Sequence, residues 1–514
     1  MCGIAGIAGN YTDADKNCFE NIMDIMNYRG PDESSIKDTP NCLLGHNRLS
    51  IIGPDNGIQP ISNEDRTSWI VCNGEIYNYE HLKRKHLQMH QFSCNSDSEV
   101  VLHLYEEYGK ACLGYIEGMF AFIISDCRSS KSDIFAARDP LGIKPLYYGQ
   151  KKGKFYFASE LKCLYQMVDE VKEFPAGHYF TIAEGFVPYR TVHDIISRKS
   201  SYGQESREKI QQNICLLLEN AVKKRLMADV PLGVLLSGGL DSSLIAAIAS
   251  KYNQGSKPMK SFCIGLKGSA DLVAARSVAD YIGTDHYEYI YSEQDVLEAI
   301  PKVIYHLESF EPSLVRSAIP SYFVSMLAAE HVKVILSGEG ADELFAGYAY
   351  MENMPDEQTL KYELARVLDS LHNINLQRMD RMSMAQSLEG RVPFLDEELI
   401  NYVFNLPTEI KSPQNGKIEK WLLRTSFDNA EYLPKEILWR KKAEFSEGSG
   451  TKNFLEIVFE QCISDLELKT DRERILKEEN IHIRSKQELY FYRIFKTFYP
   501  SSSVADTVGR WSVA

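Results

Sequence analysis

The feature that most constrains the fold is the stretch 234–243, which reads Val-Leu-Leu-Ser-Gly-Gly-Leu-Asp-Ser-Ser. Apolar residues precede a glycine pair, and an apolar, alanine-rich run follows at 244–249. A short strand, a glycine-rich turn and a helix form an architecture that binds phosphate, because glycine lets the backbone approach an anion and the helix N-terminus attracts it. The stretch matches neither a Walker A loop nor GxGxxG. It predicts a phosphate-binding turn, with an ordinary strand–turn–helix as the alternative.

The order Ser237-Gly238-Gly239, then Asp241-Ser242, resembles the pyrophosphate loop of ATP pyrophosphatases, which cleave ATP to AMP and pyrophosphate. A second glycine-rich turn at 337–343 reads Ser-Gly-Glu-Gly-Ala-Asp-Glu and follows the apolar segment 332–336. The resemblance implies an ATP site that includes both turns. The residues it assigns to that site are Leu236, Ser237, Gly238, Gly239, Asp241, Ser242, Ile264, Ser337 and Gly338.

Strand-like and helix-like segments alternate through this half of the chain. We expect strands at 261–266, 286–291 and 332–336, and helices at 207–227 and 271–281. This alternation predicts a doubly wound parallel sheet of α/β class with ligands at the carboxyl ends of the strands, so the two turns should be neighbours. Asp241 and Asp342 would then hold Mg²⁺, which favours one or two carboxylates together with phosphate oxygens. The alternative is that both carboxylates only cap helices.

Composition excludes several classes of protein. The 514 residues are 44% hydrophobic and 25% charged, as in globular proteins, and allow two to four domains. A net charge of −14 argues against non-specific binding to nucleic acid or anionic membranes, and we expect no nucleic-acid or membrane partner. The eleven cysteines form no CxxC pair, and the N-terminal residues do not read as a signal peptide. We therefore expect a cytoplasmic protein without a disulfide framework.

The N-terminal half carries a set of residues that fits one task. If Met1 is removed, Cys2 combines a thiol with a free α-amino group, a self-contained nucleophile and base. Arg48 would pair with a substrate carboxylate and Asp97 with a substrate ammonium. The Asn73 side chain and the Gly74 amide would form an oxyanion hole. These groups describe a pocket for glutamine, although each alone is a weak signal.

In this order, these residues resemble the class II glutamine amidotransferase domain, an N-terminal-nucleophile hydrolase. The resemblance also places Glu75 at the glutamine. Short strand-like runs at 119–125, 133–137, 145–149, 154–159 and 178–182, with helices at 18–27 and 100–108, suggest stacked sheets flanked by helices, the αββα arrangement of that class. A polar stretch at 193–206 is interpreted as the linker. The expected domains are 2–193 and 207–514.

A cysteine glutaminase joined to this second domain resembles glutamine-hydrolysing asparagine synthetase of the bacterial B type. SGGLDSS, SGEGADE and EGRVPFLD (389–396) carry the likeness in combination. It implies that a carboxylate attacks the α-phosphate of Mg-ATP, giving an acyl-adenylate and pyrophosphate. Ammonia from glutamine then crosses an internal tunnel and displaces AMP to leave an amide. Glu339 and Lys442 are implied catalytic residues, and Lys442 would reach the phosphates.

The acceptor pocket departs from the family pattern. The family reads roughly Thr-Thr-x-Arg-Ala-Ser where this chain has Ser-Leu-Val-Arg-Ser-Ala at 313–318. Arg316 is retained as a carboxylate contact, whereas Leu314 replaces a hydroxyl and Pro312 alters the approach. Loss of a hydroxyl from a site for a small polar substrate costs specificity. Aspartate is the leading acceptor, and another carboxylate, in a sugar or secondary metabolite, is the rival.

Two other classes of function stay open. A ring-closing relative resembling β-lactam synthetase usually lacks the working cysteine, whereas this chain retains Cys2. A non-catalytic glutamine- or nucleotide-binding protein is disfavoured by the intact glycine-rich turns and both aspartates. The expected partners are small molecules: glutamine, ATP and the carboxylate acceptor. A homodimer is compatible with the resemblance, and the sequence does not fix the oligomeric state.

Overall fold

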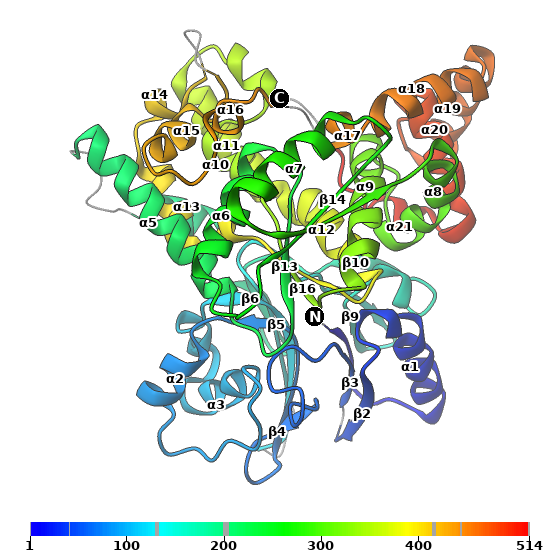
Figure 1. Cartoon of the computed structure of the whole chain (residues 1–514). Helices are drawn as coiled ribbons and strands as arrows, with labels where there is room; N and C mark the ends of the chain where they lie inside the picture. Colours follow the sequence, from blue (N-terminus) through cyan, green and yellow to red (C-terminus); the bar gives the residue numbers. More distant parts are fainter. Residues whose placement is uncertain are drawn as a thin grey trace.

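The structure is a computed structural model that describes residues 2–40, 42–128, 133–198, 205–413, 418–442 and 445–511. The N-terminal half, blue to cyan, lies below the C-terminal half, green to red (Figure 1). In the described residues the strands form two six-stranded antiparallel sheets in the first half and one five-stranded parallel sheet in the second.

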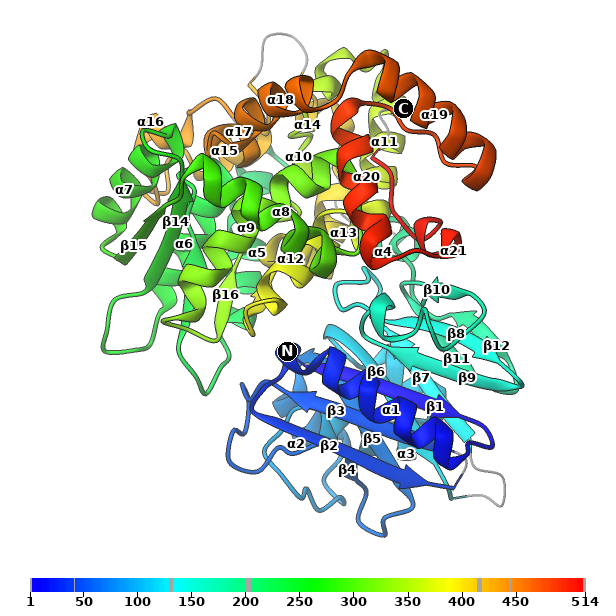
Figure 2. The ribbon, with the colours of Figure 1, turned by 90° about the vertical axis from the view of Figure 1, so that its right-hand side faces the viewer.

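The two antiparallel sheets of the first half are stacked, as Figure 2 shows. The strands of the first sheet are, in spatial order, β10 (Val171–Glu173), β8 (Tyr147–Lys151), β9 (Lys154–Ala158), β1 (Gly3–Ala8), β3 (Cys42–Arg48) and β2 (Glu33–Thr39). Those of the second are β12 (Gly185–Pro188), β11 (His178–Thr181), β7 (Asp133–Arg138), β6 (Gly118–Asp126), β5 (Ser68–Ile76) and β4 (Ile61–Ser62).

Both faces of these sheets are buried, so their central strands read as apolar runs rather than alternating ones. Along β1, Ile4 and Ala8 pack with Val71 and Ile123 between the sheets. Ala5 and Ile7 of the same strand instead join the cluster that contains residues of α1 (Asp13–Ile25). On the outer face of the second sheet lie α2 (Tyr79–His86) and α3 (Glu99–Tyr108). The predicted αββα arrangement is confirmed.

The parallel sheet has the order β15 (Asp285–Ile290), β14 (Lys260–Gly265), β13 (Leu232–Leu235), β16 (Val334–Leu336) and β17 (Glu389–Arg391). Helices follow the strands on both faces, which confirms the predicted doubly wound α/β fold. The strand order reverses between β13 and β16, the place where such folds bind ligands. Both glycine-rich turns leave the sheet at this point.

The remaining helices belong mainly to the second half. They are α4 (Val192–Ser197), α5 (Arg207–Arg225), α6 (Leu240–Tyr252), α7 (Ala270–Ile282), α8 (Glu293–Leu307), α9 (Pro312–Ala329), α10 (Ala341–Phe345), α11 (Glu357–Asp369), α12 (Asn375–Met384), α13 (Glu397–Asn405), α14 (Thr408–Lys411), α15 (Trp421–Phe427), α16 (Lys435–Leu438), α17 (Phe445–Gly448), α18 (Thr451–Cys462), α19 (Asp465–Glu479), α20 (Lys486–Phe498) and α21 (Ser502–Ala505). Short 3₁₀ turns span Asn27–Arg29, Gly109–Gly114, Leu161–Cys163, Ala349–Asn353, Ser370–Asn373 and Pro393–Leu395. None of the helices in the described residues has the length and apolar composition that a membrane crossing requires.

The stretch predicted as a linker begins as a helix. Thr191 and Asp194 cap the start of α4 reciprocally, the Thr191 hydroxyl accepting from the Asp194 amide and the Asp194 carboxylate from the Thr191 amide. Residues 199–204 of this stretch lie outside the described residues. The domain limits 2–193 and 207–514 therefore stay a prediction.

Buried charges join the two halves where they meet. The Arg29 guanidinium lies 2.6 Å from Glu160 and 2.9 Å from Asp380, and Arg381 lies 3.0 Å from Glu308. All are almost fully buried, so each charge depends on its partners. We call this group the junction cluster; its members are Arg29, Glu160, Lys162, Glu308, Asp380 and Arg381.

Candidate active sites

Cys2 lies immediately before β1, next to the junction cluster. Its backbone nitrogen donates to Asn73 Oδ1 at 3.0 Å, and its carbonyl accepts from Arg29 Nε at 3.0 Å. Burial raises the pKa of the Cys2 thiol, so the thiol needs a base before it can attack. The predicted base is the α-amino group that removal of Met1 would free, and Met1 lies outside the described residues.

Asn73 and Gly74 stand on β5 beside Cys2. The Asn73 side-chain nitrogen is buried and has no hydrogen-bond partner among the described residues, as expected of a donor kept for a ligand. At Gly74 a Cβ would come within 2.1 Å of the Met119 carbonyl oxygen, so only glycine fits there. The backbone can therefore lie against β6 while β5 brings Asn73 to Cys2.

Cys2, Arg48, Gly74, Glu75 and Asp97 line one small cavity of about 20 Å³. Arg48 is held at its rim, because its guanidinium donates to the Gly53 carbonyl at 2.7 Å and to Glu33 at 3.0 Å. Burial raises the pKa of the Asp97 carboxyl to about 6, although this group accepts from the Ile76 amide at 2.6 Å. The structure thus brings together an anion-binding guanidinium, a carboxylate and a thiol.

Glu75 differs from the other residues of this cavity, because it reaches across to the second half. Its Oε2 atom lies 3.4 Å from the Arg391 guanidinium at the end of β17. Burial and the nearby Glu389 carboxylate raise the pKa of Glu75 well above its usual range. A direct glutamine contact is therefore not its only available role.

A second, larger cavity of about 540 Å³ lies at the carboxyl ends of β13, β14 and β16. It is large enough for a nucleotide and a small acceptor. The predicted residues that line it are Leu236, Ser237, Gly239, Asp241, Ser242, Ile264, Arg316, Ser337, Gly338, Glu339, Asp342 and Lys442. Gly238 does not line it: with a φ of +69°, its Cα faces Ala274, and a Cβ would come within 2.5 Å of that residue.

The two glycine-rich turns are neighbours, as predicted. A Cβ on Gly338 would come 2.8 Å from Asp241 Cβ and 2.9 Å from the Ser242 amide. Within the first turn, the Ser242 hydroxyl lies 3.0 Å from the Ser237 hydroxyl and accepts from the Ser237 amide at 3.2 Å. The turn is therefore preformed around the start of α6, where a phosphate is stabilised.

Two lysines face the two aspartates. The Lys420 ammonium group contacts Asp241 and lies 2.7 Å from Asp342, which Lys442 also approaches to 2.7 Å. Burial favours the neutral acid, but the two ammonium groups outweigh it and hold the pKa of Asp342 well below its usual range. At Asp241, burial dominates and raises the pKa. Lys420 was not predicted, because no sequence motif contains it.

The predicted acceptor residue, Arg316, lines the same cavity. The Arg316 guanidinium donates to Gln487 Oε1 at 2.5 Å, while its Nε is buried without a partner in the described residues. Leu314 lines the same cavity and is 1% exposed. Arg378 was not predicted; it pairs with Glu339 and donates to the Ser317 hydroxyl at 2.9 Å. Two guanidinium groups and one apolar side chain thus line this part of the cavity.

Comparison with known proteins places both halves. A glutamine amidotransferase domain model matches residues 1–204, and an asparagine synthase model matches residues 213–355 and 349–495. The chain is 39% identical to asparagine synthetase (glutamine-hydrolyzing) 2 of Arabidopsis thaliana, over 99% of this chain and 89% of the relative. It is 38% identical to the asparagine synthetase (glutamine-hydrolyzing) of Sandersonia aurantiaca, over 97% of both chains. Full-length likeness at this level shows that the chain belongs to the glutamine-hydrolysing asparagine synthetases, a family of glutamine-dependent, amide-forming carbon–nitrogen ligases.

Proposed function

We propose that this protein converts aspartate to asparagine, using ATP and ammonia released from glutamine, with AMP and pyrophosphate as the other products. The observation that carries the proposal is the larger cavity, where the two glycine-rich turns, the Asp241 and Asp342 carboxylates and the Arg316 and Arg378 guanidinium groups are among the lining groups. Such a set can hold a triphosphate and a carboxylate side by side.

Glutamine hydrolysis is assigned to the smaller cavity. Arg48 would bind the α-carboxylate and Asp97 the α-ammonium of glutamine, which leaves the side-chain amide at Cys2. The Cys2 sulfur attacks the amide carbon, and its proton passes through the freed α-amino group to the departing ammonia. The buried, unpartnered Asn73 nitrogen would donate to the oxyanion of the tetrahedral intermediate. Water then releases glutamate.

Adenylation is assigned to the larger cavity. The Ser237 and Ser242 hydroxyls, together with the start of α6, would bind the pyrophosphate portion of ATP. An oxygen of the acceptor carboxylate attacks the α-phosphorus, the bond to the β-phosphate oxygen breaks, and pyrophosphate leaves. Lys442 would balance the charge that builds up on the leaving group.

The carboxylates of this cavity fit Mg²⁺. Asp241 Oδ1 is buried without a hydrogen-bond partner in the described residues, and Asp342 lies alongside it across Lys420. These two residues would hold the ion, which supplies positive charge next to the phosphates. ATP entry would loosen the contacts of Lys420, because phosphate oxygens compete for its ammonium group.

Ammonia formed at Cys2 would complete the reaction in the larger cavity. Its nitrogen attacks the acyl carbon, the bond to the AMP oxygen breaks, and loss of a proton leaves the amide. The location of Cys2 supports direct transfer, because its carbonyl is bound by Arg29, which pairs with Asp380 of the second half. The nucleophile therefore adjoins the contact between the two halves.

One observation favours a second acceptor. Leu314 puts an apolar group on the wall near Arg316, where the family pattern has a hydroxyl. The same chemistry on a larger, less polar carboxylate is the alternative that this residue supports.

The test is AMP formation from ATP and ammonia across a panel of carboxylates, with aspartate included. We expect AMP and asparagine to form in equal amounts with aspartate. An aspartate rate equal to the rate without acceptor, in protein that still hydrolyses glutamine, would refute aspartate as the acceptor. A response to another member of the panel would identify the alternative.

A further inference from the structure

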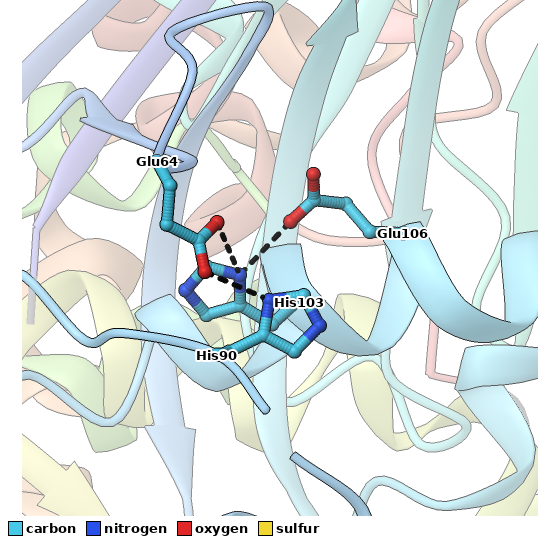
Figure 3. Close-up of side chains that lie close together, drawn as sticks. All are labelled: Glu64, His90, His103 and Glu106. Atoms are coloured by element: carbon cyan, nitrogen blue, oxygen red, sulfur yellow. Dashed lines mark hydrogen bonds and ion pairs between the residues drawn. The ribbon is translucent and has the colours of Figure 1, made fainter. Parts of the chain in front are cut away.

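A group of histidine and glutamate side chains lies on the outer side of the second antiparallel sheet (Figure 3). Glu64 comes from the turn between β4 and β5, His90 from the segment after α2, and His103 and Glu106 from one face of α3. Each offers one ligand atom, and the four atoms lie within 4.8 Å of one another. We propose that these residues, the histidine–glutamate site, bind a divalent transition-metal ion, with Zn²⁺ as the best match.

The spacing of the donor atoms suits tetrahedral zinc. His90 Nδ1 lies 3.0 Å from Glu64 Oε1, and His103 Nδ1 lies 2.9 Å from Glu106 Oε2 and 3.7 Å from Glu64 Oε2. Zinc bonds of 2.0–2.2 Å in a tetrahedron separate neighbouring ligand atoms by roughly 3.3–3.6 Å. The observed distances fall on both sides of this range, so small movements of the side chains would complete the site.

The surroundings bring Nδ1 of both imidazole rings to the shared centre. His90 Nε2 faces Glu107 at 3.1 Å, and His103 Nε2 faces Glu99 at 3.5 Å. Each Nδ1 points to the shared centre. The other ring nitrogen of His90 is hydrogen-bonded to a carboxylate, the arrangement that fixes zinc-binding histidines, whereas His103 Nε2 lies near Glu99 without a hydrogen bond in the described structure. Glu99 is itself fixed, because Ser93 and Cys94 donate to it four times at 2.7–3.0 Å.

One ligand residue of this site, His103, is buried, whereas Glu64 is exposed and His90 and Glu106 are partly buried. The His103 side chain is fully buried and its Nε2 forms no hydrogen bond in the described structure. Its ring is packed between His90, with centroids 4.3 Å apart, and Phe92, at 5.0 Å. Asn63 donates to Glu106 Oε1 at 2.6 Å, which leaves Oε2 on the side of the shared centre.

Charge and donor type identify the ion. Four carboxylates surround the two imidazoles, namely Glu64, Glu99, Glu106 and Glu107. This excess of negative charge favours a dication, and a mixture of imidazole nitrogen and carboxylate oxygen favours Zn²⁺ over Mg²⁺ or Ca²⁺. Protonated His90 and His103 rings could instead donate to the surrounding glutamates. The test below distinguishes this alternative from a bound metal ion.

An ion here would brace the segment between α2 and α3. That segment comprises residues 87–98, and its last three residues, Ser96, Asp97 and Ser98, line the smaller cavity. A metal would tie its first part to the β4–β5 turn and to α3. The assignment of the metal site does not depend on the function proposed for that cavity.

The test uses the full chain, freed of metal with a chelator and titrated with Zn²⁺ alone in a calorimeter. We expect one equivalent to bind tightly, with affinity at least tenfold lower in His90→Gln and in Glu106→Gln. The matched control is His81→Gln, an exposed histidine on α2, which should bind like the unmodified chain. Zn²⁺ should raise the Tm of the unmodified chain and the control but not of the two variants.

Free cysteines can also bind zinc, so Co²⁺ is the second probe. In the histidine–glutamate site Co²⁺ should show the visible bands of a tetrahedral ion without thiolate charge transfer, and both variants should lose them. Zinc affinity unchanged in both variants, thiolate charge transfer as the main feature, or no binding beyond that of simple carboxylates would each overturn the proposal. The last result would leave protonated imidazoles as the explanation of the cluster.

Discussion

The buried Asp97 carboxylate should lower the free energy of unfolding at neutral pH. The same charge should be needed to bind the ammonium group of glutamine. Its carboxyl is 3% exposed, and burial raises its pKa from 3.8 to about 6. Replacement by Asn keeps an acceptor for the Ile76 amide, which donates to Asp97 at 2.6 Å, and removes the buried charge. We therefore expect Asp97→Asn to be more stable than the unmodified chain at pH 7.5.

The magnitude follows from the pKa. A change from 3.8 to about 6, at roughly 1.4 kcal/mol for each tenfold change, amounts to about 3 kcal/mol. Because the folded pKa is the higher one, the cost is absent below pH 3.8, grows as the pH rises, and is complete above about 6. The stabilisation by Asp97→Asn should shrink accordingly between pH 7.5 and pH 5.

Function should change in the opposite direction. Loss of a charge-assisted bond to the substrate ammonium costs about 1.5–3 kcal/mol, so kcat/KM for glutamine should fall roughly 10- to 100-fold in Asp97→Asn. In the unmodified chain, kcat/KM should also fall as the pH drops through 6, since this parameter reports the free enzyme.

The assays are thermal unfolding followed by near-UV circular dichroism and glutamate release from glutamine, both at several pH values. Asp55→Asn, an exposed position in the nearby loop, is the control and should change neither result. A lower Tm for Asp97→Asn at pH 7.5, or a glutamine kcat/KM that does not change between pH 5 and 7.5, would refute the reasoning.

Three further predictions concern the two cavities. Cys2→Ala should abolish glutamine-dependent amide formation and leave ammonia-dependent formation intact; equal glutaminase rates would contradict this. Asp342→Asn should abolish pyrophosphate release but not glutamine hydrolysis, because it removes a negative charge next to Lys420 and Lys442 with little change in volume. The two rates are measured in the same protein preparation, and unchanged pyrophosphate release would contradict the assignment. Arg316→Lys should raise the acceptor KM with little change in the KM for ATP, since lysine lacks the planar pair of donors, and an unchanged acceptor KM would exclude Arg316 as the contact.

Much of the fold was predictable because local signals agreed with the global arrangement. The apolar run, glycine pair and alanine-rich segment after Val234 produced β13, the turn and α6 within a few residues. The strand expected at 145–149 instead starts at Tyr147, and the helix expected at 18–27 starts at Asp13, where Thr12 caps it. Caps and turns set such ends more firmly than periodicity does.

The parts of the sites that escaped prediction are held by distant contacts. Lys420 reaches Asp241 from 179 positions away, and Arg378 reaches Glu339 from 39. Nothing near either residue marks it, because a lone basic residue on a helix or turn is usually solvated. His90 and Glu64 likewise meet His103 only in the folded chain, because the three residues come from different segments. Glycine-rich turns can be recognised from the local sequence, whereas the charged residues that surround them in the fold cannot.

The junction cluster limits how the two halves could be exchanged between relatives. Arg29, Glu160 and Lys162 come from the first half, and Glu308, Asp380 and Arg381 from the second. The six formal charges cancel only together: the first set carries one surplus positive charge and the second one surplus negative charge. A chimaera assembled at the polar stretch would therefore bury an unmatched ion unless the donor brought the same three-and-three arrangement. The two halves can therefore be exchanged only between relatives that carry the same buried charges at the junction. Recombination between diverged copies should give a stable protein only where both copies share this arrangement.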